Sequence, residues 1–227
     1  MIRMEILNSN SVLRKMIVLF IESIIMNIKD IILVREQSLT FFKPILSLCV
    51  YVYCMTYEEF YGTDYDKFKK VLDSVLNTIQ SSSFDCIQYT TSRIKSPESV
   101  LEKIGNDYSL LHDIIGVRII CSFVDEIYQV KEWINSSFEV VEVRDYLRHP
   151  KPSGYRSLHV IVKVNECLVE IQVRTIALDF WANLEHQIHY KKDIEDEELI
   201  RSELKRCADE IASLDLSFQT IKDRIEG

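Results

Sequence analysis

The segment 151–164 reads KPSGYRSLHVIVKV, a short basic turn that runs directly into an alternating apolar stretch. Pro152 fixes its own φ and pushes Lys151 towards extended geometry, while Gly154 allows the positive φ that a turn needs before a strand begins. We therefore expect the turn to present Tyr155 rather than bury it, as a platform on which a flat base could stack. The alternative is a hairpin turn with a capping tyrosine. The basic residues around the ring are His149, Lys151 and Arg156.

Alternation of apolar and polar residues continues on both sides of this turn and predicts a sheet. In 167–174, Ile171 and Val173 alternate with polar residues, so this strand anchors through one face and aims Glu170 at the other. In 89–95, the alternation places Arg93 and Lys95 on one side. The remaining predicted strands are 114–123, 138–143 and 157–164.

Apolar residues at helical spacing predict helices over 66–80, 97–104, 125–135, 176–191 and 197–225. Ser96, Asp125 and Thr175 are the expected N-caps of three of them, with Pro97 as a first helical residue. The helix after Thr175 has an expected core stripe of Ile176, Phe180, Leu184 and Ile188. The last helix places Leu199, Leu204, Ile211, Leu214, Phe218 and Ile221 where they could meet a partner helix.

Composition excludes several classes of protein. A net charge of −8 argues against a general nucleic-acid coat, which needs a broad basic face. The six cysteines contain no CxxC pair and are expected to be small buried hydrophobes in a reducing compartment. The five glycines form no Walker-type or GxGxxG loop, so side-chain cations must hold any nucleotide phosphate. One local basic cluster, 144–156, is available for that purpose.

Residues 1–54 carry two apolar runs, 16–34 and 39–54, each interrupted by charge or proline. Neither gives the roughly 18 nearly uncharged residues of a spanning helix. A signal peptide is disfavoured by Glu22 within the apolar region and by the lack of a small-residue cleavage site. We expect an appended apolar extension of uncertain status, with a start at Met55 and a membrane segment as alternatives.

Two sets of polar residues are candidates for chemistry. Arg93, Lys95, Ser99 and Lys103 could converge on an anion near a helix N-terminus, where the helix dipole also favours phosphate. The alternative is a solvated charged face. Asp113 and Glu170 lie at the edges of two different predicted strands, where two carboxylates could share a divalent ion beside a transferring phosphoryl group. The alternative is that each carboxylate only pairs with an arginine.

Five ordered motifs carry a resemblance to a known family: 91–99 (TSRIKSPES), 113–118 (DIIGVR), 151–159 (KPSGYRSLH), 170–175 (EIQVRT) and 180–186 (FWANLEH). Over about 84–192 the chain resembles the synthetase domain of the RelA/SpoT family, in particular the stand-alone small alarmone synthetases. The resemblance implies an α/β (α+β) fold with a nucleotidyltransferase-like mixed sheet flanked by helices. It also implies transfer of the β,γ-pyrophosphate of ATP to the 3′-hydroxyl of GTP or GDP, giving the stringent-response alarmone (p)ppGpp and AMP.

Roles follow from the resemblance position by position. Asp113 and Glu170 would hold Mg²⁺, and Glu170 would also orient or deprotonate the acceptor hydroxyl. ATP would be bound by Arg93, Lys95, Ser99 and Lys103 on its phosphates and by Arg118 on adenine. Tyr155 would stack on guanine. The other acceptor-site residues would be Lys151, Arg144, His159, Gln172 and Ala182.

The resemblance also sets the expected organisation: the extension 1–54, a synthetase domain over 55–192, and an oligomerisation helix over 193–227 in a cytoplasmic homotetramer without a hydrolase domain. Ser153 replaces the asparagine often found before this glycine, and the regions 104–113 and 164–167 look short for the family. No stable nucleic-acid or membrane partner is expected. Two other functions stay open: a toxin that pyrophosphorylates the 3′ end of tRNA, disfavoured by the acidic net charge, and a non-catalytic nucleotide-binding regulator, disfavoured by the intact Asp113 and Glu170.

Overall fold

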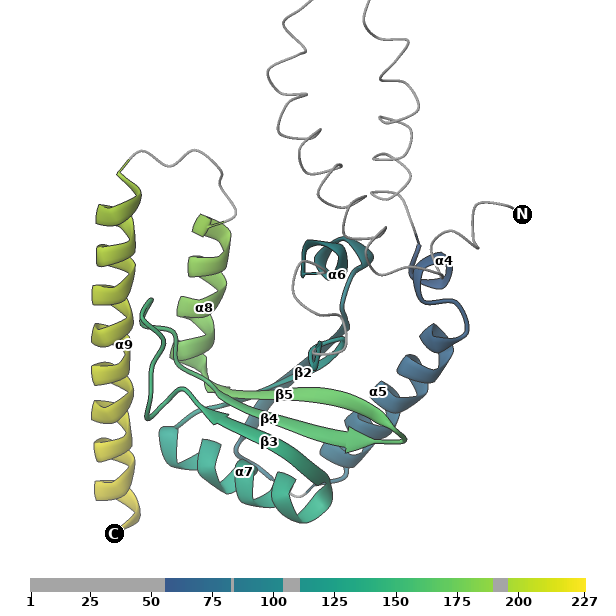
Figure 1. Ribbon diagram of the computed structural model, residues 1–227. Helices are drawn as coiled ribbons and strands as arrows, with labels where there is room; N and C mark the ends of the chain where they lie inside the picture. The colour runs from purple at the N-terminus through teal and green to yellow at the C-terminus, as the bar shows by residue number, and fades with distance from the viewer. Residues whose placement is uncertain (1–55, 83, 104–110, 190–195) are drawn as a thin grey trace, which may run out of the picture. The chain divides into compact units, whose positions relative to one another are not determined.

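The computed structural model describes residues 56–82, 84–103, 111–189 and 196–227 (Figure 1). The chain divides into two compact units, formed by 1–65 with 95–111 and by 66–94 with 112–227. Each unit is described by itself. The expected N-terminal extension, with Cys49 and Cys54, lies outside the described residues.

The larger unit contains a five-stranded mixed sheet with strand order β1-β2-β5-β4-β3. β2 and β5 run parallel, and every other neighbouring pair is antiparallel. The strands are β1 Ile87–Ile94, β2 Ile115–Cys121, β3 Glu139–Asp145, β4 Leu158–Val164 and β5 Cys167–Thr175. The helices that accompany them are α5 Asp64–Gln80, α7 Val124–Ser137, α8 Ile176–His189 and α9 Glu197–Glu226.

One face of the sheet is apolar and is covered by α5 and α7 (Figure 1). Every second residue of the central strands points there, since side chains alternate along a strand. On α5 the buried residues Val71, Val75 and Ile79 recur one helical turn apart. Full burial of one such side chain contributes roughly 1.5–3 kcal/mol. The buried strand residues in this core are Ile115, Val117, Ile119, Cys121, Leu158, Val160, Val162, Cys167, Val169, Ile171 and Val173.

A hairpin turn and a register shift determine which residues share the polar face of the sheet. The β4–β5 hairpin turns through Asn165 and Glu166, both with positive φ (47° and 62°), as two-residue hairpins require. A register shift between Val140 and Glu142 lets Val140 face the core while Glu142 joins the polar side. The sequence predicted these strands, but the shift in β3 has no sequence signal.

Helix α8 is rotated relative to the prediction. Three of the four residues of its expected core stripe, Ile176, Phe180 and Leu184, are exposed, and Ile188 is half-buried. The buried apolar residues are Leu178, Trp181 and Ala182. The expected cap is confirmed, because the Leu178 amide donates to Thr175 Oγ1 at 3.1 Å. The rotation places the polar residues Asp179 and Asn183 towards the arginines of the sheet, which apolar spacing alone does not reveal.

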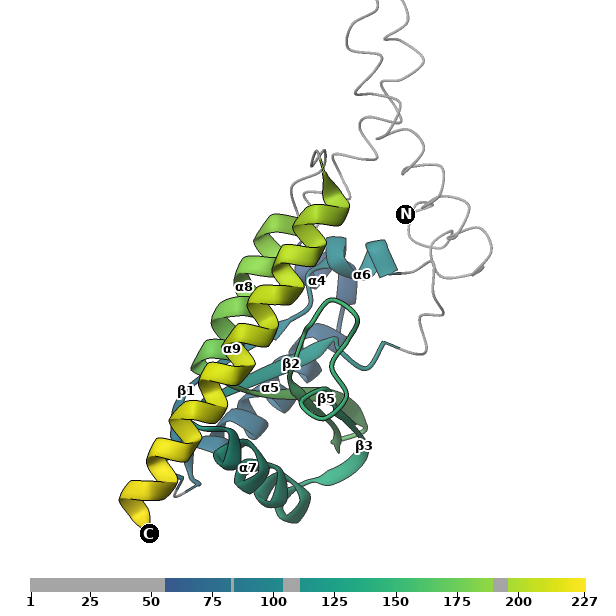
Figure 2. The same cartoon turned by 90° about the vertical axis from the view of Figure 1, so that its left-hand side faces the viewer.

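Helix α9 packs antiparallel to α8 and then continues past it towards α7 (Figures 1 and 2). Ala208 and Asp215 are its buried residues. Leu204 and Ile211 pack into the α8 contact as a partner helix would require, whereas the other apolar residues named from the sequence are exposed. Those exposed residues are Leu199, Leu214, Phe218 and Ile221.

Helix α7 begins earlier than predicted, so the expected N-cap at Asp125 is wrong. The helix starts at Val124, and the Glu126 carboxylate accepts hydrogen bonds from the Ser122 and Phe123 amides at 3.0 Å each. Lys222 of α9 donates to both Asp125 and Glu126. These bonds tie the end of the chain to α7.

The described part of the smaller unit contains α4 (Tyr57–Tyr61) and α6 (Pro97–Lys103). Thr56 and Glu59 form a capping box at the start of α4. Tyr61 donates from its hydroxyl to the Lys95 carbonyl at 2.7 Å. At α6, Ser96 Oγ accepts from the Ser99 amide at 3.3 Å, so the predicted N-cap is confirmed.

Four cysteines fall among the described residues, and none of these four is in a disulfide. Cys121 and Cys167 are buried as expected, while Cys86 and Cys207 are half-buried. In the part of the chain that the structure describes, no helix combines the length and the apolar character needed to cross a bilayer.

Candidate functional site

The polar face of the sheet brings together residues from four strands. Arg118 of β2 lies opposite Gln172 of β5, Gln172 lies opposite His159 of β4, and His159 lies opposite Arg144 of β3. Residues paired across neighbouring strands point to the same face. Four residues predicted for the two nucleotides therefore form one row, and Glu170 lies two residues from Gln172 on the same side.

Glu170 is the carboxylate at the centre of this face. Its Oε1 lies 3.0 Å from His159 Nδ1, and its Oε2 accepts from Gln172 Nε2 at 2.7 Å. Burial alone would raise the pKa of Glu170, but the hydrogen bonds from His159 and Gln172 outweigh it and hold the pKa below its usual value. Glu170 is thus a buried carboxylate kept ionised, with one lone pair still available on each oxygen.

Asp113 precedes β2 and is half-buried. Its negative charge raises the pKa of Glu170 and so opposes the hydrogen bonds just described. The two carboxylates are therefore near enough to influence each other's charge. Glu170 lies within β5, opposite Gly116, rather than at the strand edge expected from the sequence.

The turn before β4 has the predicted form. Gly154 has φ 91°, and its amide donates to the Lys151 carbonyl at 2.8 Å. A Cβ at Gly154 would lie 2.7 Å from the Ala208 Cβ, so glycine is also needed for the close approach of α9. Arg156, expected near the base, instead binds Asp209 at 2.8 Å and fastens the turn to α9.

Tyr155 is half-buried, so the expectation that the turn presents it rather than buries it is met only in part. Its ring packs against the cluster formed by Trp181, Ala182 and Ala208. The Tyr155 hydroxyl accepts from Arg174 at 2.5 Å, and it lies 2.8 Å from His159 Nε2. Burial raises the pKa of Tyr155, with Arg174 opposing this. The ring is therefore fixed in one orientation by its own hydroxyl.

Two further residues frame this aromatic site. Tyr146 packs edge-on against Tyr155, with ring centroids 6.0 Å apart, and against His159 at 5.1 Å. The Lys151 ammonium lies 4.8 Å from the Tyr146 ring and 5.0 Å from the Tyr155 ring, in cation–π geometry. Lys151 is therefore beside the platform, as predicted.

Arg174, which was not predicted as a site residue, completes a closed cycle of hydrogen bonds. The cycle runs through Arg174, Tyr155, His159, Glu170 and Gln172. One NH2 donates to Tyr155 and to Gln172 Oε1, the latter at 2.8 Å. Because Arg174 donates to the Tyr155 oxygen, the hydroxyl proton is left for His159, whose other nitrogen faces Glu170. This cycle of hydrogen bonds thus connects Tyr155, the predicted base platform, with Glu170, the predicted catalytic carboxylate.

Arg118 and Arg174 share the buried carboxylate of Asp179, at 3.0 and 3.1 Å. Burial lowers the pKa of Arg118, as does the nearby Arg174, while Asp179 opposes both effects. Asp179 was not among the residues predicted from the sequence. The available signal was a pair of polar residues one helical turn apart, Asp179 and Asn183, within the otherwise apolar stretch 176–184.

Arg144 lies at the outer end of the row. Its guanidinium makes two hydrogen bonds of 2.7 Å to the two oxygens of Glu142. This bidentate contact lowers the pKa of Glu142 and raises that of Arg144. A strand neighbour thus already neutralises the cation predicted for an acceptor phosphate.

The predicted ATP-phosphate residues are divided between the two units. Arg93 is exposed on β1, opposite Gly116. β1 ends at Ile94, so Lys95 follows the strand. Lys95 is buried and belongs to the smaller unit, and its placement on one side with Arg93 stays a prediction. Ser99 and Lys103 are both on the seven-residue α6, where Lys103 is exposed. Convergence of the four residues on one anion stays a prediction.

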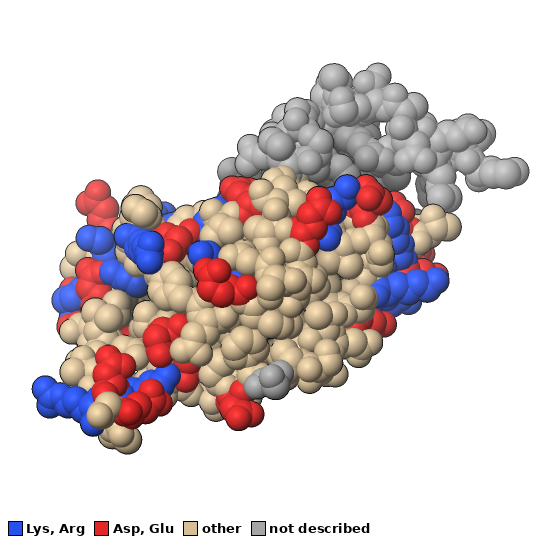
Figure 3. All heavy atoms as spheres, turned by 90° about the horizontal axis from the view of Figure 1, so that it is seen from below, with Lys and Arg blue, Asp and Glu red and all other residues tan. Residues whose placement is uncertain are grey.

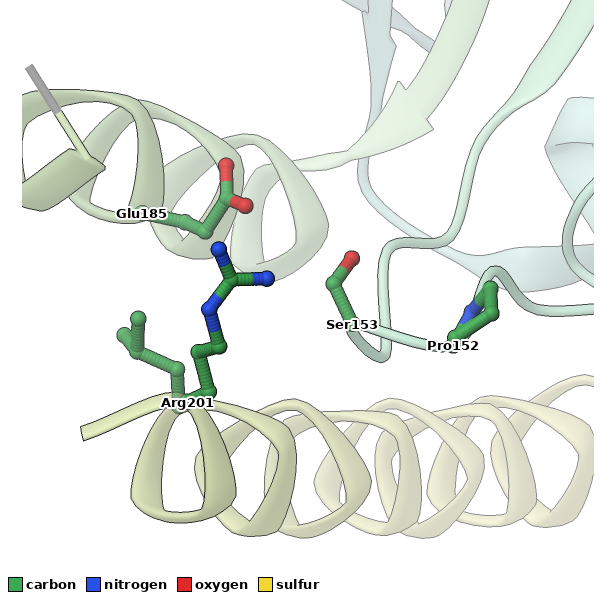
Figure 4. Close-up of a pocket in the computed structure, with 5 residues that line it drawn as sticks. Pro152, Ser153, Glu185 and Arg201 are labelled. Carbon is green, nitrogen blue, oxygen red and sulfur yellow. The ribbon is translucent and has the colours of Figure 1, made fainter. Parts of the chain in front are cut away.

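A pocket of about 140 Å³ lies beside the turn rather than on the polar face (Figure 4). Glu185 of α8 and Arg201 of α9 point towards each other across it, with Ser153 alongside (Figure 4). Its lining residues are Pro152, Ser153, Glu185, Arg201 and Leu204, which include none of the predicted site residues. The predicted acceptor residue Ala182 is instead buried under Tyr155.

Residues 92–195 match a family model described as the region found in RelA/SpoT proteins. The chain is 40% identical to the GTP pyrophosphokinase YwaC of Bacillus subtilis, over 62% of this chain and 76% of that protein. It is 37% identical to the GTP pyrophosphokinase YjbM of the same organism, over 62% and 74%. Among solved structures it is similar to small alarmone synthetase 1 of B. subtilis bound to its product pppGpp, with a TM-score of 0.64 and 31% identity over 75% of this chain and 98% of that one. The mixed sheet flanked by helices that was expected from the sequence is confirmed.

Proposed function

This chain belongs to the RelA/SpoT family, and we propose that it is a GTP pyrophosphokinase that makes (p)ppGpp from ATP and GTP or GDP. In this reaction the 3′-hydroxyl oxygen of the acceptor forms a bond to the β-phosphorus of ATP. The bond between that phosphorus and the oxygen bridging to the α-phosphate breaks, and AMP leaves with this oxygen. The hydroxyl proton passes to a carboxylate base.

The observation that carries the proposal is the state of Glu170. His159 and Gln172 bond its two oxygens and keep it ionised in a buried place. An ionised carboxylate can orient the acceptor hydroxyl and take its proton as the new bond forms. Phosphoryl transfer otherwise depends mainly on positioning and charge neutralisation, which the surrounding cations supply.

On the polar face, Arg118 would meet adenine and Arg93 the ATP phosphates. The family resemblance also implies Lys95, Ser99 and Lys103 as ATP-phosphate residues. Tyr155 would stack on guanine, and its fixed ring supports this role. Lys151 and Arg144 would meet the acceptor phosphates, where a phosphate would replace part of the Arg144–Glu142 ion pair. The remaining acceptor-site residues would be His159, Gln172 and Ala182.

Asp113 and Glu170 fit a magnesium ion. They are oxygen donors near enough for their charges to interact. Among the described residues no group of three or more His, Cys, Asp or Glu side chains forms a complete metal cage. Mg²⁺ commonly binds through one or two carboxylates together with substrate phosphates. Asp113 and Glu170 would hold it, and bound there it would neutralise charge on the transferring phosphates.

We also propose that the chain forms a homo-oligomer, most simply the tetramer that the family resemblance implies. Support comes from four exposed residues on the second half of α9: Leu214, Phe218, Ile221 and Ile225. Their spacing of 4, 3 and 4 residues is that of a helix–helix seam. A stripe of this size is more apolar than a solvated helix face needs.

Purified protein incubated with ATP, Mg²⁺ and either GDP or GTP tests the proposed activity. We expect AMP and a guanosine tetra- or pentaphosphate to appear in equal amounts, separated by anion-exchange chromatography. Formation of ADP, or loss of ATP without a new guanine nucleotide, would contradict the proposal.

A further inference from the structure

Four donors from four elements converge on one buried carboxylate, that of Asp179 at the start of α8. Its Oδ1 binds Arg118 NH1 at 3.0 Å and Arg174 NH1 at 3.1 Å. Its Oδ2 accepts from Asn183 Nδ2 at 3.0 Å and from the Tyr89 hydroxyl at 3.3 Å. A carboxylate with all these bonds can adopt only one orientation.

Arg118 depends on this carboxylate for its position. Its NH1 binds Asp179 and, at 3.3 Å, Asn183 Oδ1. Its Nε is buried and has no acceptor among the residues that the structure describes. The orientation of the guanidinium is therefore set from one end, by Asp179 with Asn183 as an auxiliary partner.

Arg174 links Asp179 to Tyr155 and Gln172. While NH1 binds Asp179, NH2 binds the Tyr155 hydroxyl and Gln172. One arginine thus lies between Asp179 and the proposed guanine platform. From Asp179, one ion pair reaches Arg118, the proposed adenine residue, and two successive hydrogen bonds through Arg174 reach Tyr155, the proposed guanine residue.

We propose that Asp179 is a positioning residue that holds Arg118 and Arg174 together and so orders both nucleotide sites at once. This inference rests on the proposed function. Asp179 touches neither nucleotide in this scheme and acts through the two arginines. Two guanidinium groups repel each other in a buried place, and one carboxylate between them removes most of that repulsion. Asparagine at this position would offer one acceptor oxygen and no charge, and its NH2 group would oppose an N–H donor.

The test is Asp179→Asn, with Asp215→Asn as the matched control. Asp215 is a second buried aspartate, 6% exposed against 5% for Asp179, and it binds Thr175 Oγ1 rather than an arginine. We expect Asp179→Asn to raise KM for ATP and for GDP by about tenfold or more each, the range of a charge-assisted hydrogen bond, with a smaller fall in kcat. Asp215→Asn should leave both KM values unchanged. A rise for one nucleotide alone, or equal effects in both variants, would overturn the proposal.

A double variant separates positioning from a merely structural role. If Asp179 acts on ATP through Arg118, then adding Asp179→Asn to Arg118→Gln should raise the Kd of a non-hydrolysable ATP analogue little further, measured by calorimetry. Full additivity of the two effects would contradict the proposal. Binding of the ATP analogue does not require turnover, so this test can be made whether or not the protein transfers pyrophosphate. A lack of pyrophosphate transfer by the parent protein would contradict the proposed function and not the role of Asp179.

Asn183→Ala provides a second route in case Asp179→Asn does not fold. Asn183 is exposed, so its loss should spare the fold, yet it bonds both Asp179 and Arg118. We expect a rise of a few-fold in KM for ATP, less than for Asp179→Asn, because Asn183 is exposed and water can replace its amide as a partner of Arg118. No change in this variant would count against the proposal.

Discussion

At the residue scale, the polar face depends on a small number of fixed charges. Glu170 is kept ionised by His159 and Gln172 although it is buried, and burial without partners would favour the neutral acid. Tyr155 is oriented by its own hydroxyl rather than by its place in an exposed turn. Glu170 and Tyr155, the residues proposed as the base and the guanine platform, are thus each held by defined hydrogen-bond partners.

The variants Glu170→Gln and Asp113→Asn each remove one negative charge without removing volume. We expect each to lower the rate of pyrophosphate transfer by about 100-fold or more, the usual contribution of a positioned base or charge. Circular dichroism should show a retained fold. Glu132→Gln, an exposed change on α7, is the control and should keep the parent rate. Transfer near the parent rate in either site variant would refute the two-carboxylate assignment.

A pair of substitutions at Tyr155 separates its ring from its hydroxyl. Tyr155→Ala should weaken acceptor binding by roughly 1–3 kcal/mol, the usual value of base–aromatic stacking, and spare ATP affinity. Tyr155→Phe keeps the ring but loses the bonds to Arg174 and His159, so a smaller loss is expected. Calorimetry that gives equal losses for both nucleotides would mean that the ring is only structural.

At the element scale, strand alternation carried most of the predictive information. The period of two in 167–174 correctly placed Ile171 and Val173 in the core and Glu170 on the polar face. The same pattern contained Arg174, whose partner Tyr155 lies in a turn 19 residues earlier and cannot be identified from spacing. For α8, apolar spacing named Phe180 and Leu184 as core residues, but the helix turns Asp179 inward to meet two arginines. Apolar periodicity fails where a buried ion pair decides the helix orientation.

Asp215 offers a test of how α9 is fixed. Burial raises the pKa of Asp215 above its ordinary value, with the Thr175 hydroxyl opposing. When folding raises the pKa of a carboxyl group, the group favours the folded protein at pH values below its pKa in the unfolded chain. This contribution to the free energy of unfolding is lost as the pH rises through the pKa of the folded protein. At pH 7.5 the ionised form should therefore oppose folding, and Asp215→Asn should raise Tm there by about 2–4 °C, equivalent to about 1 kcal/mol.

Calorimetric scans at several pH values check this expectation. The advantage of Asp215→Asn should shrink towards about pH 4, near the ordinary pKa of an aspartate. Asp223→Asn, an exposed change on the same helix, is the control and should show no such trend. A Tm difference that stays constant with pH would contradict the assigned cause.

At the scale of the whole molecule, the charge bears on which acceptor is used, and the exposed apolar surface bears on self-association. The net charge is −8, and α9 begins beside the acidic run 195–198. Viewed from the α7 side, Asp and Glu side chains lie among the Lys and Arg side chains (Figure 3). The acidic net charge opposes binding of an extended phosphate backbone, which favours a free nucleotide over tRNA as acceptor.

The exposed stripe on α9 leads to a prediction of size. Light scattering at micromolar concentration should give a mass near four times the 26.7 kDa of one chain. Phe218→Asp, within the stripe, should shift the protein to smaller species. Leu216→Asp, also an exposed change but on another side of α9, is the control and should not. A monomer in the parent protein would defeat the oligomer proposal and leave the site assignments unaffected.

The most direct measurement of the central claim offers the protein two acceptors at once. Parent protein is incubated with γ-labelled ATP, Mg²⁺, GDP or GTP, and deacylated tRNA in the same tube, and the nucleotide and tRNA fractions are then separated. The account predicts that the label appears on the guanine nucleotide and depends on Glu170, so that Glu170→Gln leaves it in ATP. Label found chiefly in the tRNA fraction would contradict alarmone synthesis.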